Sequence, residues 1–177
     1  LTENLSNMMR YSCDMKNHRV PLAKEIEHVK AYVSIINMRF DDSITLECCV
    51  EAPLLQVSIL KLTLQPLVEN AWSHGILPKD GHRGIIRIDA EVREEALIVT
   101  VTDDGVGITP EKSRELNAQL SEVNYEAADS EKGSGVALKN VNNRIKLSDG
   151  PEYGLTLFPA EGGGCRVVMK VKRKQNE

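Results

Sequence analysis

Two neighbouring segments with a period of two constrain the fold of this chain most strongly. Apolar residues alternate with polar ones through residues 84–93 and again through 96–103. Such alternation is typical of strands that bury one face. Only Glu94 and Glu95 separate the two segments, so we expect them to form a β-hairpin.

The order of the remaining elements indicates the fold class. We expect helices at 3–17, 22–40, 58–75 and 135–148, a half-buried strand at 43–50, and a second hairpin from strands 153–158 and 164–171. Residues 109–132 carry no apolar period, apart from a short helix after Thr109-Pro110, and predict a long, polar, mobile segment. Hairpins with helices gathered on one face indicate an α+β two-layer sandwich, not a doubly wound parallel sheet.

Composition excludes several classes of protein. The chain is 41% hydrophobic and 27% charged with a net charge of -4, which is typical of a globular domain. Aromatic residues are only 4%, and together with the acidic balance this speaks against a nucleic-acid partner. The four cysteines and four histidines lack metal-ligand spacing. No apolar run approaches the roughly 18–20 residues that cross a bilayer.

An acidic residue ends the inward row of strand 96–103. The period of two places Asp103 on the core face, where an unpaired carboxylate is costly, so we expect a hydrogen-bond donor beside it. Gly105 and Gly107 follow, and glycines permit both a sharp turn and the close approach of a flat ligand. For this short motif alone, a turn that merely ends a strand is an equally good interpretation.

A glycine-containing segment leads directly into helix 135–148. Free backbone amides and the positive end of the dipole at a helix start favour an anion. The spacing is neither that of a Walker loop nor that of a Rossmann motif. The residues concerned are Gly133, Ser134, Gly135, Val136, Ala137 and Leu138.

A third group of polar residues lies on the central predicted helix. Spacings of three and four place Asn70, Ser73 and His74 on one face, with Glu69 at its edge. A neutral amide oxygen with a carboxylate nearby suits a hydrated Mg²⁺. Taken singly, Asn70 is also explained as part of a helix cap or a surface cluster.

Together these motifs resemble the ATPase superfamily that joins gyrase, the heat-shock chaperone, histidine kinases and MutL. Glu69 and Asn70 resemble its N box, Asp103-x-Gly105-x-Gly107 its G1 box, and Gly133-x-Gly135 its G2 box. Further stretches are similar to the LytS/YesM-like class of bacterial sensor histidine kinases: Leu5 to Tyr11, Glu25 to Tyr32, Arg39-Phe40, Leu64 to Ala71, His74-Gly75 and Leu138 to Ile145.

The resemblance implies a Bergerat-type fold, with a mixed, mostly antiparallel sheet and helices on one face. Its ATP pocket would lie beneath a flexible lid at about 109–132, with ATP and Mg²⁺ as cofactors. Asp103 would accept a hydrogen bond from the adenine amino group, Asn70 would coordinate Mg²⁺, and Glu69 would orient its water shell. Arg144 would either hold the helix against the lid or approach the phosphates. The remaining nucleotide-binding residues would be His74, Gly105, Gly107, Ile108, Gly133, Ser134, Gly135, Val136, Ala137 and Leu138.

The resemblance also implies two regions and a phosphotransfer reaction. Residues 1–40 would end a dimerisation region with linker helices, and residues 41–177 would form the catalytic domain. The γ-phosphoryl group of ATP would pass to a histidine, then to an aspartate of a response regulator receiver domain. No histidine here has the neighbours of the phosphoacceptor, so we expect it upstream, in a homodimeric kinase. The domain would be the cytoplasmic part of a membrane-anchored bacterial sensor.

Three departures from the family pattern keep alternatives open. Ser73 stands where relatives commonly carry Lys, Ala137 replaces a glycine, and Cys165 replaces a Thr. Ser73 and Ala137 motivate a non-catalytic nucleotide-binding or phosphatase-biased module as one alternative. An anti-sigma-type serine kinase is the other, although the N-terminal helices and the Asn140 to Arg144 pattern speak against it.

Overall fold

The computed structural model describes residues 18–122 and 134–174, and its main feature is a five-stranded sheet. The strands are β2 (Ile44–Cys49), β4 (Gly84–Arg93), β5 (Ala96–Asp103), β6 (Gly154–Pro159) and β7 (Cys165–Lys172). Their order across the sheet is β2-β4-β5-β7-β6. β2 pairs with β4 in parallel, whereas the other three pairings are antiparallel. The predicted mixed, mostly antiparallel sheet is confirmed.

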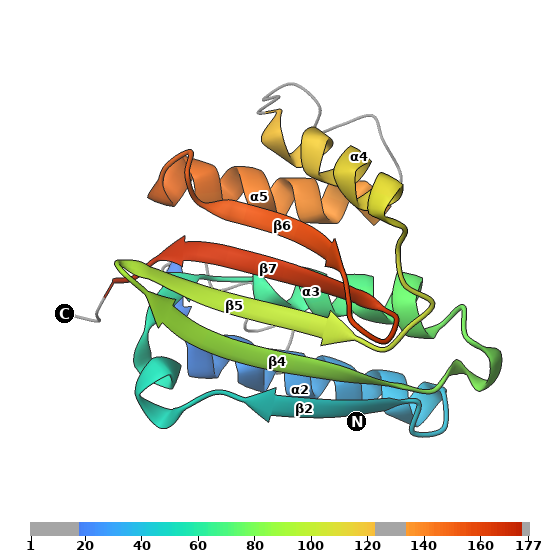
Figure 1. Ribbon diagram of the computed structural model, residues 1–177. Helices are drawn as coiled ribbons and strands as arrows, with labels where there is room; N and C mark the ends of the chain where they lie inside the picture. The colour runs from blue at the N-terminus through green and yellow to red at the C-terminus, as the bar shows by residue number, and fades with distance from the viewer. Residues whose placement is uncertain (1–17, 123–133, 175–177) are drawn as a thin grey trace.

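Helices form the second layer of the structure. α2 (Leu22–Arg39), α3 (Leu64–Asn70) and α5 (Ser134–Asp149) lie on one face of the sheet, and α4 (Pro110–Ser121) lies beside β6 (Figure 1). Shorter turns are the 3₁₀ helices Ala52–Gln56 and Asp80–His82 and a π-helical turn, Ala71–Ile76, that continues α3. The predicted two-layer α+β arrangement is confirmed. Within the described residues, no helix combines the length and the hydropathy of a transmembrane span.

The core fills the space between the two layers. Every second residue of β5, from Leu97 to Asp103, is buried, as the alternation predicts. The same holds for Ile86 and Ile88 on β4. These side chains meet the apolar faces of the helices, among them Val29, Leu67, Val68, Val141 and Ile145.

The segment predicted as a single helix at 58–75 has a different structure at its start. Ser58–Leu60 form strand β3, which pairs antiparallel with β1 (Arg19–Pro21) in a small second sheet. The chain then turns at Leu62, whose φ is +58°, and α3 begins at Leu64. All three β3 residues are buried, and so short an apolar run has no period that separates a strand from a helix.

The polar segment after Thr109 was predicted to be mobile apart from a short helix. In the structure it forms the 12-residue helix α4. Thr109 caps it through a hydrogen bond from the Lys112 N–H, and Pro110 occupies the first turn, as predicted. Ser113 and Asn117 attach it to the edge of β6 through hydrogen bonds with the Leu157 backbone, and its Leu120 side chain is buried in the core. The predicted helix at 3–17 and residues 123–133 of the predicted mobile segment lie outside the described residues.

Candidate functional site

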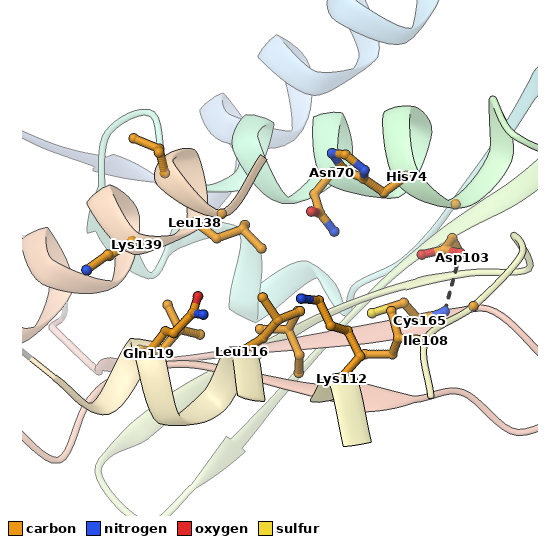
Figure 2. A pocket seen from close by; sticks show the side chains of 16 residues that line it. Asn70, His74, Asp103, Ile108, Lys112, Leu116, Gln119, Leu138, Lys139 and Cys165 are labelled. Atoms are coloured by element: carbon orange, nitrogen blue, oxygen red, sulfur yellow. Dashed lines mark hydrogen bonds between the residues drawn. The ribbon is translucent and has the colours of Figure 1, made fainter. Parts of the chain in front are cut away.

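A cavity of about 880 Å³ lies between α3, α4, α5 and the ends of β5 and β7 (Figure 2). Its walls combine polar and apolar side chains from sequence segments that are far apart. The lining residues include Asn70, His74, Asp103, Gly107, Ile108, Lys112, Leu116, Gln119, Gly135, Val136, Leu138, Lys139 and Cys165. Most of the residues singled out in the sequence therefore meet in one place.

Asp103 lies at one end of the cavity and is only 4% exposed. Its Oδ1 accepts hydrogen bonds from the backbone N–H groups of Gly105 at 2.9 Å and Cys165 at 3.3 Å. These are the donors that burial required, while no described residue donates to Oδ2. Burial raises the pKa of the carboxyl group, although the two backbone donors oppose this shift. The site thus offers one acceptor oxygen to a ligand.

Two glycines bring the end of β5 against the turn after α3. The Val106 N–H donates to the Gly75 carbonyl at 2.9 Å. A Cβ on Gly105 would lie 2.2 Å from the carbonyl carbon of Gly75, and a Cβ on Gly75 would lie 2.4 Å from Oδ1 of Asp103. Gly105 therefore permits contact between two backbone segments and does not line the cavity, whereas Gly107, with φ +78°, does.

The α3 side presents Asn70 and His74 to the cavity, as the helical spacing predicts (Figure 2). Ser73 is exposed, and its hydroxyl donates to the Glu69 carbonyl at 2.6 Å. The Glu69 side chain is not among the lining residues. It accepts a hydrogen bond from Gln65. Together with burial, which is the main cause, its charge raises the pKa of Tyr32 on α2 to about 12. The role of Glu69 stays a prediction.

The beginning of α5 also reaches the cavity. Gly135, Val136 and Leu138 line it, while Ala137 is exposed and is not among the lining residues. Helix α5 begins at Ser134, and Gly133 lies outside the described residues. The start of this helix therefore borders the same cavity as Asp103 and Asn70, and the nucleotide-binding roles of these residues stay predictions.

Several lining residues were not predicted from the sequence. Lys112, Leu116 and Gln119 come from α4, in the segment without an apparent period, and Lys139 comes from α5. The Thr109-Pro110 cap with apolar residues one turn apart, Leu116 and Leu120, was the available signal. Cys165 borders the cavity, and burial, with the nearby Asp103 charge, raises the pKa of its thiol to about 12. Arg144 contacts the carbonyl groups of Lys61 and Leu62 and is not among the lining residues.

The arrangement suits a ligand that has a flat polar end and an anionic end. Oδ2 of Asp103 can accept a hydrogen bond from a heterocyclic amino group, and nearby glycines leave room for a ring. The ammonium group of Lys112 and the start of α5 favour negative charge at the other end. The described residues contain no cluster of three or more His, Cys, Asp or Glu side chains able to hold a metal.

The fold is that of histidine kinase catalytic domains. The catalytic domain of the histidine kinase ThkA superposes with a TM-score of 0.65 at 16% identity, over 92% of this chain and 100% of that one. The model of histidine kinase-, DNA gyrase B- and HSP90-like ATPases matches residues 56–175. The chain therefore belongs to this ATPase family, and the predicted superfamily is confirmed. A second model, described as histidine kinase, matches residues 1–44.

Two sequence relatives are sensor kinases of staphylococci. An uncharacterized sensor-like histidine kinase of Staphylococcus epidermidis is 32% identical over 96% of this chain. The sensor protein kinase HptS of Staphylococcus aureus is 29% identical over 97% of it. The chain spans 31% of the length of each of these two relatives. The LytS/YesM-like subclass stays a prediction.

Proposed function

We propose that this chain is the ATP-binding catalytic domain of a two-component sensor histidine kinase. In the whole protein, it would transfer the γ-phosphoryl group of ATP to a histidine, and the group would then pass to a response regulator aspartate. The observation that carries this proposal is Asp103, a buried acid whose second oxygen is left for a ligand at the end of a large cavity. The two family models and the sensor kinase relatives support it.

Each wall of the cavity has its own part in binding ATP. Asp103 accepts the hydrogen bond of the adenine amino group, and Gly107 and Ile108 lie beside the base. The start of α5 and the ammonium group of Lys112 face the phosphates. Because such transfers depend on positioning and charge neutralisation, the chain's main task is to hold the phosphates in line with the acceptor.

A Mg²⁺ ion is part of the proposal, and Asn70 is the residue that fits it. Its side-chain amide points into the cavity from α3 (Figure 2), and a neutral oxygen suits an ion that keeps several waters and phosphate oxygens as ligands. The ion would supply charge neutralisation at the phosphates. With Ser73 in place of a lysine, this wall relies on Asn70, His74 and the bound ion.

The partners of the whole protein are proposed from its relatives. The structure of ThkA in complex with the response regulator TrrA contains a fold of this kind, with a TM-score of 0.62 at 16% identity. A response regulator receiver domain is the expected acceptor for this kinase as well. We also propose that the intact kinase is a homodimer and that segments outside this chain attach it to a membrane.

A single substitution tests the nucleotide site. Asp103→Asn keeps an oxygen for the N–H donors of Gly105 and Cys165 but replaces Oδ2 by an amide that donates. We expect calorimetry to show a loss of ATP affinity of about 10- to 100-fold, the value of one charge-assisted hydrogen bond. The matched control is Asp104→Asn, because Asp104 is exposed and its Oδ1 accepts a backbone hydrogen bond that asparagine can keep.

The outcome against the proposal is equal affinity of the Asp103→Asn and wild-type proteins for ATP. Folding is checked in the same samples. Because burial raises the pKa of Asp103, its charged form weakens the fold at neutral pH, and we expect Asp103→Asn to be at least as stable as wild type.

The phosphotransfer itself is tested in the full-length protein with labelled ATP and Mg²⁺. Acid-labile label on a histidine supports the kinase assignment. Label on a partner serine would favour the serine kinase alternative, and nucleotide binding without transfer would favour the non-catalytic one.

A further inference from the structure

A carboxylate on α2 holds the start of α3 from outside that helix. Glu25 is fully buried, and it accepts three backbone N–H bonds: Leu62 donates to Oε1 at 2.8 Å, and Thr63 and Leu64 donate to Oε2 at 2.9 and 3.0 Å. Thr63, at the cap position, makes no side-chain cap bond of its own. Glu25 therefore supplies the capping acceptor that α3 requires.

A guanidinium group on α5 holds the same loop from the other side. Arg144 donates to the Lys61 carbonyl at 2.6 Å and to the Leu62 carbonyl at 3.3 Å. Residues 61–63, here called the joint, are therefore held from both sides. The Glu25 carboxylate accepts from the N–H groups of Leu62 and Thr63, and the Arg144 guanidinium donates to the carbonyl groups of Lys61 and Leu62. Leu62 has φ +58°, a conformation that costs energy for leucine and persists only where the surroundings impose it.

The joint lies between the helices that form two walls of the cavity. α3, which begins directly after it, leads to Asn70 and His74, and α5 begins at the cavity and reaches the joint through Arg144. We propose that the joint sets the spacing of α3 and α5 across the nucleotide cavity, with Glu25 and Arg144 as its positioning residues. Neither side chain is among those lining the cavity.

This assignment connects α2 to the nucleotide site. α2 itself lines no part of the cavity, and the joint is the route by which we expect Glu25 to affect ATP binding. A displacement of α2 would pull on three amide groups at the start of α3 and on no ligand directly. The expected effect on ATP affinity rests on the proposed function, because it requires that this chain binds ATP.

Three variants of α2 test the joint. Glu25→Gln keeps the shape of the side chain but replaces one acceptor oxygen by an amide that faces N–H groups. Val29→Ala shortens a fully buried apolar side chain of the same helix, and Glu27→Gln changes an exposed carboxylate that pairs with Lys24. ATP affinity, thermal unfolding and amide hydrogen exchange are measured for each.

For Glu25→Gln we expect ATP affinity to fall about tenfold. Amide exchange should become faster at Leu62, Thr63 and Leu64 and also at the start of α5. Val29→Ala should lower the melting temperature at least as much while keeping wild-type ATP affinity and slow exchange at the joint. Glu27→Gln should match wild type in every measurement. A purely structural role for Glu25 would make Glu25→Gln and Val29→Ala alike, and that result overturns the proposal.

Arg144→Met provides a second, independent test. Because both side chains act through one loop, the loss of ATP affinity in the double variant with Glu25→Gln should be smaller than the product of the two single losses. Independent, multiplicative losses would contradict a shared joint. If wild-type protein does not bind ATP, the proposed function fails. The exchange rates at residues 62–64 and at the start of α5 then still decide whether the joint links the two helices.

Discussion

The two long walls of the cavity are attached to the sheet by different means. At the α3 wall, the turn at Gly75 touches the end of β5 through backbone atoms, so closely that neither Gly75 nor Gly105 has room for a Cβ. At the α4 wall, neutral side-chain amides bridge the gap. Asn117 donates to and accepts from the backbone of Leu157 on β6 at 2.8 Å in both directions.

Asn142 completes the attachment of the α4 wall. It is fully buried on α5, where its amide donates to the Leu120 carbonyl at 2.8 Å and accepts from the Leu155 N–H at 2.9 Å. The difference teaches that the end of the cavity near Asp103 depends on close packing, whereas the opposite wall depends on hydrogen bonds between side chains and a strand edge. Added volume should damage the first wall, and loss of an acceptor or donor should damage the second.

Gly105→Ala should have the largest effect, because its methyl group would lie 2.2 Å from the Gly75 backbone. Overpacking of this kind costs about 1–3 kcal/mol or more, and here backbone, not a flexible side chain, must move. We expect a loss of that size in the free energy of unfolding, measured with urea, together with loss of ATP binding. Gly135→Ala, where a Cβ meets nothing within 4 Å, should keep wild-type stability or exceed it.

Equal stability of the Gly105 and Gly135 variants would show that the contact between Gly75 and Gly105 is not tight. The proposed difference between the two walls would then be wrong.

Asn142→Ala tests the other wall. It leaves the Leu120 carbonyl and the Leu155 N–H without their partner in a buried place, at about 1–3 kcal/mol for each unsatisfied group. The free energy of unfolding should fall accordingly, and amide exchange should become faster along α4. Asn140→Ala, at an exposed position of the same helix, is the control and should change stability little. If the two variants lost similar amounts of unfolding free energy, the hydrogen bonds of Asn142 would not be what attaches α4.

The parts of the site that the sequence predicted are those in which a regular hydrophobic period contains polar residues at specific positions. Asp103 stood out because an acid continued an apolar row, and Asn70 and His74 because helical spacing placed them on one face. The sheet was predictable for the same reason, since β4 and β5 alternate almost without interruption.

The parts that could not be predicted depend on contacts between distant residues. α4 has few apolar residues. Its position depends on hydrogen bonds from Ser113 and Asn117 to the Leu157 carbonyl of β6, some forty residues away in the sequence. The influence of Glu69 on Tyr32 of α2 and the capping of α3 by Glu25 depend on tertiary packing in the same way. Local propensity contains none of this information.

Lys112→Met should have a smaller effect, because the Lys112 side chain is 52% exposed and pairs with Glu115 at 3.0 Å. Exposed charge interactions are worth up to about 1 kcal/mol, so we expect ATP affinity to fall about fivefold or less. The loss should shrink at high salt and be absent for adenosine, which lacks phosphates. An equal loss for ATP and adenosine would place Lys112 near the base instead of the phosphates.

The smallest expected effect concerns pH and again separates the two walls. His28 is buried between α2 and α3, and burial lowers its pKa from the ordinary 6.5, with Lys61 acting in the same direction and Glu25, Gln65 and Glu69 opposing. The folded state therefore resists protonation, while the unfolded chain takes up a proton near 6.5. This contribution to stability is complete above that pH and is lost as the pH falls below it.

The measurement is urea unfolding at about pH 7.5 and about pH 6.0, on either side of the ordinary histidine pKa. His28→Gln should reduce the loss of stability between the two conditions, whereas His18→Gln, at an exposed position, should leave the wild-type loss unchanged. Because neither α4 nor α5 contains a histidine, the α4 wall has no comparable sensitivity. Wild-type pH dependence in His28→Gln would assign the effect to the other histidines and remove this difference between the walls.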